Sequence, residues 1–135
     1  MHQIVYTSEA QPNFQLGELG AILYDARFHN NRNTVSGVLL FDGRRFLQAL
    51  EGEPQEVRDT FARISRDKRH RRIKILCDRT IECREFGIWD MATEVREAPD
   101  YSKSVVELVA SVSSPEIKAA FENFAGVRLD KGVNA

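Results

Sequence analysis

Two runs of strand-forming residues joined by an Asp-Gly pair place the strongest constraint on how this chain folds. Residues 35–41 are almost continuously apolar, Asp42-Gly43 follows directly, and the second run extends to Gly52. An Asp-Gly pair between two such runs is the strongest short signal for a tight hairpin, in which both turn positions need positive φ. We therefore predict two antiparallel neighbouring strands, the first of them buried on both faces or at the middle of a sheet.

The second of these strands carries an amide in an uncommon position. Strand side chains alternate between two faces, so Phe46, Gln48 and Leu50 share one face. An amide between two large apolar side chains must find hydrogen-bond partners or cost about 1–3 kcal/mol. Gln48 therefore requires a hydrogen-bond partner from the protein or from a bound ligand. The strand pattern does not distinguish between these two.

Composition narrows the class of protein. With 135 residues, of which 42% are hydrophobic, the chain is expected to form one domain with a hydrophobic core. A formal net charge of -1 gives no electrostatic footprint for nucleic acid or an anionic membrane. The two cysteines lack metal-site spacing, and the N-terminus lacks a signal-peptide core. We expect a cytoplasmic protein without a metal, nucleic acid or membrane as partner.

The rest of the chain alternates strand and helix patterns. Periodicity predicts a strand over residues 3–7, a helix over about 14–28, a helix opened by Pro54, and strands over 71–81 and 86–92. This order predicts an α+β fold with a ferredoxin-like βαββαββ sheet that has both helices on one face. A short helix near residues 105–112 and a second that starts at Pro115 and ends just before Gly126 would cover the opposite face.

Two helices side by side on a sheet leave a groove between them, which is a usual form of small-molecule site. The expected walls include Ile22 from the first helix and Ile64 from the second. Arg63 and Asp67 have the i,i+4 spacing of a surface ion pair. The polar candidates around the groove are Tyr6 and Gln48 on the strands, His29 and Asn30 after the first helix, and Arg63 and Asp67 at the end of the second.

Most candidates also have an ordinary structural interpretation. Tyr6 is typical of a core tyrosine, and Asn30 is typical of a residue that terminates a helix. Trp89 and Met91 alternate on the last predicted strand, as core residues do. The sequence has no phosphate-binding loop, nucleophile elbow or metal-ligand spacing. We therefore expect no enzymatic activity.

The candidates taken together resemble one known family over about residues 1–95. The matching features are Tyr6, Asn30, residues 36–43 leading to 46–52, Asp67 with Arg69-His70, and residues 86–91. This combination closely resembles the BLUF family of blue-light sensors that use flavin. The resemblance implies a non-covalently bound FAD with its ring between the two helices, a site that FMN or riboflavin could also fill.

The resemblance further implies a role for each candidate side chain. By this resemblance, Ile22 and Ile64 clamp the two faces of the ring, and His29 and Asn30 bond its pyrimidine edge. Arg63 and Asp67 lie toward the carbonyl edge and the ribityl chain. Tyr6 and Gln48 form the photoactive pair. Trp89 and Met91 match the family's variable pair near the active glutamine. Light would drive electron and proton transfer from Tyr6 to the flavin and leave Gln48 rearranged.

The implied output is a signal rather than a reaction product. We expect residues 1–95 to form the photosensor and residues 96–135 to form a helical cap within the same compact unit. The signal would pass through the last strand and the cap to an unidentified downstream signalling protein, with a homo-oligomer also expected. Two other functions stay open: a flavin-dependent redox enzyme, and a ligand-free interaction domain in which Tyr6 and Gln48 only bond each other.

Overall fold

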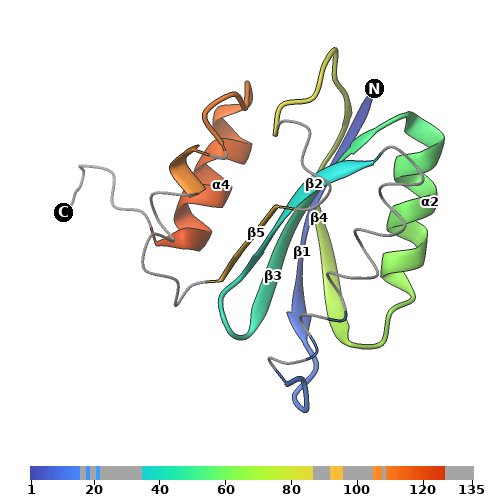
Figure 1. The fold of residues 1–135 in the computed structure, drawn as a ribbon, viewed down its shortest axis with the longest axis vertical. Coiled ribbons are helices and arrows are strands. Elements are labelled where there is room, and N and C mark those ends of the chain that lie inside the picture. Colours follow the sequence, from blue (N-terminus) through green and yellow to red (C-terminus); the bar gives the residue numbers. More distant parts are fainter. Residues whose placement is uncertain are drawn as a thin grey trace.

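A five-stranded sheet lies between helices in the computed structural model (Figure 1). The structure describes residues 1–15, 18, 21, 35–86, 92–95, 105–107 and 109–126, and it describes strand 92–95 by its backbone alone. The elements are β1 (His2–Ala10), β2 (Ser36–Phe41), β3 (Arg45–Gly52), α2 (Pro54–Ser65), β4 (His70–Thr80), β5 (Ala92–Val95) and α4 (Pro115–Ala125). Most of the helix predicted over 14–28 lies outside the described residues.

The strand order is β4-β1-β3-β2-β5, with β1 in contact with both β3 and β4. β1 pairs antiparallel with both of these neighbours, β2 pairs antiparallel with β3, and β5 pairs parallel with β2. This is the predicted α+β, ferredoxin-like arrangement. β1 extends beyond the predicted 3–7 because its later residues also have partners, with Glu9 opposite Arg45 on β3.

The hairpin between β2 and β3 is confirmed, but its turn differs from the prediction. Asp42 N–H bonds to Arg45 O at 3.1 Å, so Gly43 and Arg44 are the central residues. Only Gly43 has positive φ among the described residues of this turn, at 98°. The Asp42 carboxylate accepts from the N–H groups of Arg44 and Arg45 at 2.9 and 2.7 Å. This Asx-type capping places Asp42 at the first position of the turn.

The strand predicted over 86–92 does not include Phe86, and residues 87–91 lie outside the described residues. The described strand is β5, and the prediction was wrong at Phe86, which precedes it outside any strand. The Phe86 N–H instead donates to the Glu51 carboxylate, and its ring packs 4.9 Å from the Phe121 ring of α4. An apolar run cannot by itself distinguish a strand from a buried loop residue.

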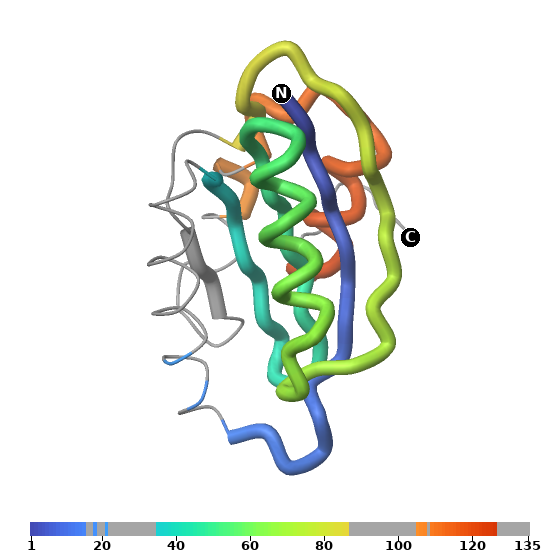
Figure 2. The backbone as a smooth tube through the Cα atoms, turned by 90° about the vertical axis from the view of Figure 1, so that its right-hand side faces the viewer, coloured from blue at the N-terminus to red at the C-terminus, as the bar shows by residue number. Residues whose placement is uncertain are grey.

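Different elements cover the two faces of the sheet. α2 lies on one face, where Val57 joins Ile4, Leu39 and Leu50 in a buried cluster. Figures 1 and 2 show α4 on the opposite side of the sheet from α2. There the buried cluster joins strand residues to the C-terminal region, and its members are Val5, Val38, Leu40, Leu47, Ala49, Phe86, Val105, Val109, Val112, Ile117, Phe121, Phe124 and Ala125.

α2 and α4 begin at the predicted prolines, and α4 ends at the predicted glycine. Pro54 and Pro115 occupy the first turns of α2 and α4, where a missing N–H has no helical partner to lose. The Ser114 side chain accepts from the Ile117 N–H, and Gly126 ends α4 with a left-handed φ of 73°. No helix within the described residues is long and apolar enough to cross a membrane.

The edge strand β4 is irregular beside Tyr6. Its pairing with β1 shifts register between Val5 and Tyr6, and again between Thr7 and Glu9. Arg72, near the second shift, has a φ of 57°. Such bulges bend an edge strand and limit its pairing with other chains, and they are frequent beside functional sites.

Gly37 permits the close contact between β2 and β3. A Cβ atom at this position would lie 2.1 Å from the backbone oxygen of Ala49, which is far inside van der Waals contact. Backbone lies on both sides of this contact, so no flexible side chain can move away. Gly43 differs because nothing lies within 4 Å of its would-be Cβ.

We predict that Gly37→Ala destabilises the protein much more than Gly43→Ala. The first substitution forces β2 and β3 apart and should lower the free energy of unfolding by about 3 kcal/mol or more. The second adds only left-handed backbone strain, about 1–2 kcal/mol. Urea unfolding followed by circular dichroism measures both, and equal losses would contradict this account of Gly37.

Candidate functional site

A buried tyrosine and a buried amide contact each other on the α2 face of the sheet. Tyr6 of β1 lies directly opposite Gln48 of β3, and the Tyr6 hydroxyl donates to Gln48 Oε1. Their exposed fractions are 2% and 4%. Phe46 and Leu50, which flank Gln48 on the same face, are also buried. The structure therefore supplies a protein partner for the amide that the strand pattern had singled out.

Aromatic side chains surround this pair and keep it away from water. The Phe61 ring of α2 meets the Tyr6 ring edge-on, with centroids 5.4 Å apart. The His70 ring lies 6.4 Å from the Tyr6 ring and 6.3 Å from the Phe46 ring. Hydrogen bonds are stronger electrostatically in such a low-dielectric environment than in water.

The environment of Tyr6 holds its phenol in the neutral form. Burial raises the pKa of Tyr6 far above its ordinary range, and the negative charge of Asp67 raises it further. The positive charge of Arg63 acts in the opposite direction and is the smaller effect. The Tyr6 phenol therefore keeps its proton and donates it in the hydrogen bond to Gln48 Oε1. The other end of the Gln48 amide is its NH2 group, which can only donate.

Asp67 forms an ion pair with Arg69, which follows it by two residues. Arg69 donates to both carboxylate oxygens, with distances of 2.9 Å to Oδ1 and 2.6 Å to Oδ2. These bonds hold the pKa of Asp67 below its usual value. α2 ends at Ser65, so Asp67 lies beyond the helix and the helical i,i+4 argument for pairing with Arg63 does not apply.

His70 connects three elements next to Tyr6, a role the sequence pattern did not reveal. Its Nδ1 lies 2.7 Å from Ser8 Oγ on β1, and its Nε2 lies 2.8 Å from the backbone oxygen of Ile64 on α2. A carbonyl oxygen only accepts, so Nε2 carries the proton in this bond. His70 on β4 thus ties the end of α2 to the sheet. The only available signal was its place in the Asp67, Arg69-His70 motif.

The described part of the chain brings several predicted site residues to one face. Tyr6 and Gln48 are in direct contact, and Ile64 packs against the buried cluster of that face. Arg63 and Asp67 act electrostatically on Tyr6. The remaining predicted residues lie outside the described residues; they are Ile22, His29, Asn30, Trp89 and Met91.

Comparison with known proteins identifies the family. A family model described as "BLUF: Sensors of blue-light using FAD" matches residues 1–92. That match covers well over half of the 135 residues. The chain belongs to the BLUF family.

Curated BLUF relatives are much longer than this chain. The blue light- and temperature-regulated antirepressor BluF of Escherichia coli K12 is 32% identical over 85 residues, which are 62% of this chain and 21% of the relative. The photoactivated adenylate cyclase subunit beta of Euglena gracilis is 34% identical over 83 residues, which are 62% and 9% of the two chains. The chain therefore spans about a fifth or less of these relatives.

Two solved structures match nearly the whole chain. The dark-state structure of BlrB, a BLUF protein, has a TM-score of 0.74 and 25% identity, and the match covers 94% of this chain and 96% of BlrB. The photo-activated state of BlsA has a TM-score of 0.71 and 26% identity, with 97% and 98% covered. The likeness in fold extends beyond the residues that the BLUF model matches.

The residues on the α2 face fit the FAD that defines BLUF proteins. Tyr6 and Gln48 supply a hydroxyl and an amide in an aromatic environment, which is the usual lining of a small-molecule site. Thr60 Oγ1 on α2 is buried and makes no hydrogen bond within the described residues. Buried hydroxyls nearly always have a partner, and a polar atom of a ligand is one way to supply it.

We predict a stability change at high pH that depends on Tyr6. Its folded-state pKa is raised, so its contribution is complete below about pH 10, the unfolded value. Above that pH the unfolded chain loses the proton and the folded chain keeps it, so the free energy of unfolding falls by about 1.4 kcal/mol per pH unit. Tyr6→Phe removes this slope.

Urea unfolding of both proteins from pH 8 to 11 measures the effect, because other groups that titrate there cancel in the comparison. At neutral pH the wild type should be more stable, since Tyr6→Phe removes the donor to buried Gln48, at a cost of about 1–3 kcal/mol. The gap should narrow as the pH rises above 10. Parallel curves would show that Tyr6 titrates normally.

Proposed function

We propose that this chain is a blue-light photoreceptor that binds FAD non-covalently and rearranges Gln48 in response to light. FMN or riboflavin could fill the same ring site. The observation that supports this proposal best is the buried contact of the Tyr6 hydroxyl with the Gln48 amide. The residues proposed to hold the flavin are Tyr6, Ile22, His29, Asn30, Gln48, Arg63, Ile64 and Asp67.

The switch rests on the two side chains of the pair. When bound, the flavin absorbs blue light and supplies an excited electron acceptor. Tyr6 would give an electron to that acceptor and then release its phenolic proton, and its hydrogen bond would lead that proton toward Gln48 Oε1. Both the electron and the proton return to Tyr6, while the Gln48 amide is left rotated or tautomerised. The amide then presents a different donor or acceptor without any change in the backbone.

The raised pKa of Tyr6 makes this transfer conditional on light. A phenol with a raised pKa in a buried site stays neutral in the dark at ordinary pH. Burial is the main cause of the raised pKa of Tyr6, and the charges of Asp67 and Arg63 adjust that pKa in opposite directions.

The output proposed is a change in contacts of the C-terminal cap. Residues 1–95 would act as the sensor and residues 96–135 as a helical cap in the same compact unit, with Trp89 and Met91 near Gln48 passing on the rearrangement. The cap would present its surface to a downstream signalling protein or to a second copy of the chain. The chain itself would catalyse no reaction.

We predict a reversible red shift of flavin absorption under blue light, absent in Tyr6→Phe and in Gln48→Leu. The first variant lacks the phenolic proton, and the second lacks the amide. The matched control is Gln55→Leu, since Gln55 is exposed on α2 and its amide donates to Asp59 of the same helix, away from the buried pair. Absorption spectra of the purified protein in darkness and under illumination provide the measurement.

Other outcomes would favour the alternatives. A yellow wild-type protein without a red shift would exclude the sensor. A colourless protein would favour a ligand-free interaction domain, in which Tyr6 and Gln48 serve the fold alone. Continuous consumption of a nicotinamide donor would favour a flavin redox enzyme.

A further inference from the structure

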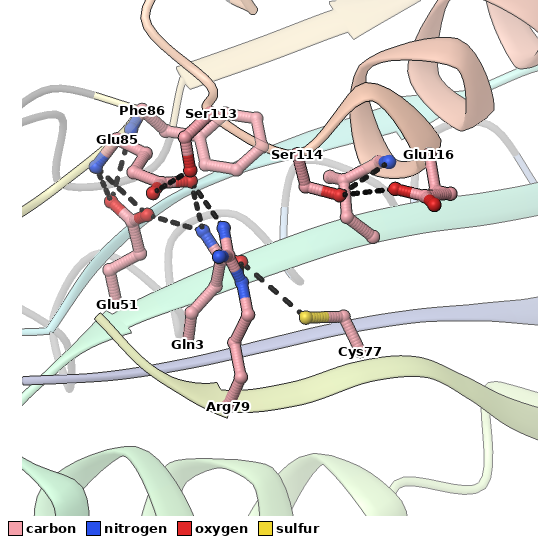
Figure 3. A network of polar contacts seen from close by, with 10 residues as sticks. Gln3, Glu51, Cys77, Arg79, Glu85, Phe86, Ser113, Ser114 and Glu116 are labelled. Atoms are coloured by element: carbon pink, nitrogen blue, oxygen red, sulfur yellow. Dashed lines mark hydrogen bonds and ion pairs between the residues drawn. The ribbon is translucent and has the colours of Figure 1, made fainter.

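A carboxylate lies fully buried on the face of the sheet opposite to the Tyr6–Gln48 pair. Glu51 of β3 has an exposed fraction of 0% and lies directly opposite Gln3 of β1. Gln3 Nε2 donates to Glu51 Oε2 at 2.8 Å. The backbone N–H groups of Glu85 and Phe86 donate to the same carboxylate at 3.0 and 3.1 Å (Figure 3).

Packing alone does not account for a charged side chain at this position. Its same-face neighbours on β3 are Leu47 and Ala49, and an apolar residue of similar volume would fill the space with less desolvation cost. What an apolar residue cannot do is accept two backbone N–H bonds from one loop. Glu51 therefore serves to fix the loop over residues 81–86 to the end of β3.

A second set of bonds fixes the same loop to the same strand. Arg84 donates to the backbone oxygen of Glu51 at 2.8 Å and to Ser36 Oγ of β2 at 2.6 Å. The loop thus contacts both the backbone and the side chain of Glu51. A displacement of this end of β3 moves the loop with it.

The loop in turn contacts the C-terminal cap. Glu85 Oε2 accepts from Ser113 Oγ at 2.7 Å, and the Phe86 ring packs on Phe121 of α4. Arg79 of β4 completes the set, since it donates to Gln3 Oε1 at 2.9 Å and to Glu85 Oε1 at 2.5 Å. We call Gln3, Glu51, Arg79, Glu85 and Ser113 the Glu51 cluster (Figure 3).

The Glu51 cluster and the photoactive pair are carried by the same two strands. Gln48 and Glu51 are three residues apart on β3, as Gln3 and Tyr6 are on β1. Three residues of strand span about 10 Å, and an odd separation puts the side chains on opposite faces. The loop held by Glu51 also leads directly into residues 87–91, which carry Trp89 and Met91.

We propose that Glu51 is a positioning residue for signal output: it couples the strand that carries Gln48 to the C-terminal cap through its bonds to Glu85 and Phe86. This inference rests on the proposed light response of Gln48. Glu51 takes no part in light absorption or in the transfer from Tyr6, because it lies on the other face of the sheet. Glu51 instead determines whether the rearrangement of Gln48 changes the C-terminal cap.

Glu51→Gln is the sharpest test of this coupling. The amide keeps the size of the side chain but has one acceptor oxygen, so in either orientation its NH2 group faces a donor: Gln3 Nε2, or the N–H groups of Glu85 and Phe86. The matched control is Glu82→Gln, the same change on an exposed residue of the same loop. Two readouts are taken in darkness and in light on the flavin-loaded full chain: the absorption red shift, and hydrogen exchange of peptides covering 81–86 and 115–126.

The expected result separates the two readouts. Wild type and Glu82→Gln show the red shift together with a light-dependent change in exchange over 115–126. Glu51→Gln keeps the red shift, and its light–dark difference over 115–126 falls at least fivefold. Three outcomes would each overturn the coupling. In Glu51→Gln, these are a light-dependent change in exchange over 115–126 as large as in the wild type, or a loss of the red shift. In the wild type, it is a red shift without any change in exchange over 115–126. A wild type with no red shift would instead refute the proposed function.

Ser113→Ala provides a second test that does not disturb the buried carboxylate. Ser113 is exposed and bonds to Glu85 at the outer end of the Glu51 cluster. This variant should keep the red shift and the light response of peptide 81–86, while the response over 115–126 is reduced. If Glu51→Gln fails to fold, Ser113→Ala alone decides. A light response over 115–126 in Ser113→Ala as large as in the wild type would then overturn the proposal.

Discussion

The antiparallel pairing of β1 with β3 is the constraint on which the rest of the structure depends. Its register sets Tyr6 opposite Gln48 on one face and Gln3 opposite Glu51 on the other. A slip of one residue would exchange the faces of every side chain on one strand. Both faces of these two strands are largely buried, so a slip would also separate the Gln48 and Glu51 side chains from their buried partners, at a cost of about 1–3 kcal/mol for each polar group left unpaired.

The two polar pairs use burial in different ways. Around Tyr6 and Gln48, burial and aromatic packing keep a neutral phenol protonated beside an amide that has both a donor and an acceptor end. Around Glu51, burial makes each hydrogen bond to the carboxylate costly to lose, which ties a loop to a strand. The first arrangement suits a group that changes its hydrogen bonds, and the second suits a group that keeps them.

Local patterns predicted most of the fold because they reflect local physics. The hairpin, the Pro starts of α2 and α4 and the Gly126 end of α4 each follow from one or two residues. The errors arose where a distant or capping contact competes with the local pattern. Asp42 turns its carboxylate to the N–H groups of the next residues and moves the turn, and Phe86 leaves the strand pattern because Glu51 and Phe121 bind it.

The sequence by itself determined the fold class and the face on which Gln48 lies, since strand alternation and hydrophobic burial act over a few residues. The same alternation puts Glu51 on the other face, but no local pattern shows that it is buried or which donors such a carboxylate will meet. Only the tertiary structure decided that Tyr6 donates to Gln48, that Asp67 pairs with Arg69 beyond the end of α2, and that the loop 81–86 closes on Glu51. Partners of buried polar groups are set by strand register and by loops that return from far along the chain, so they appear only once the chain has folded.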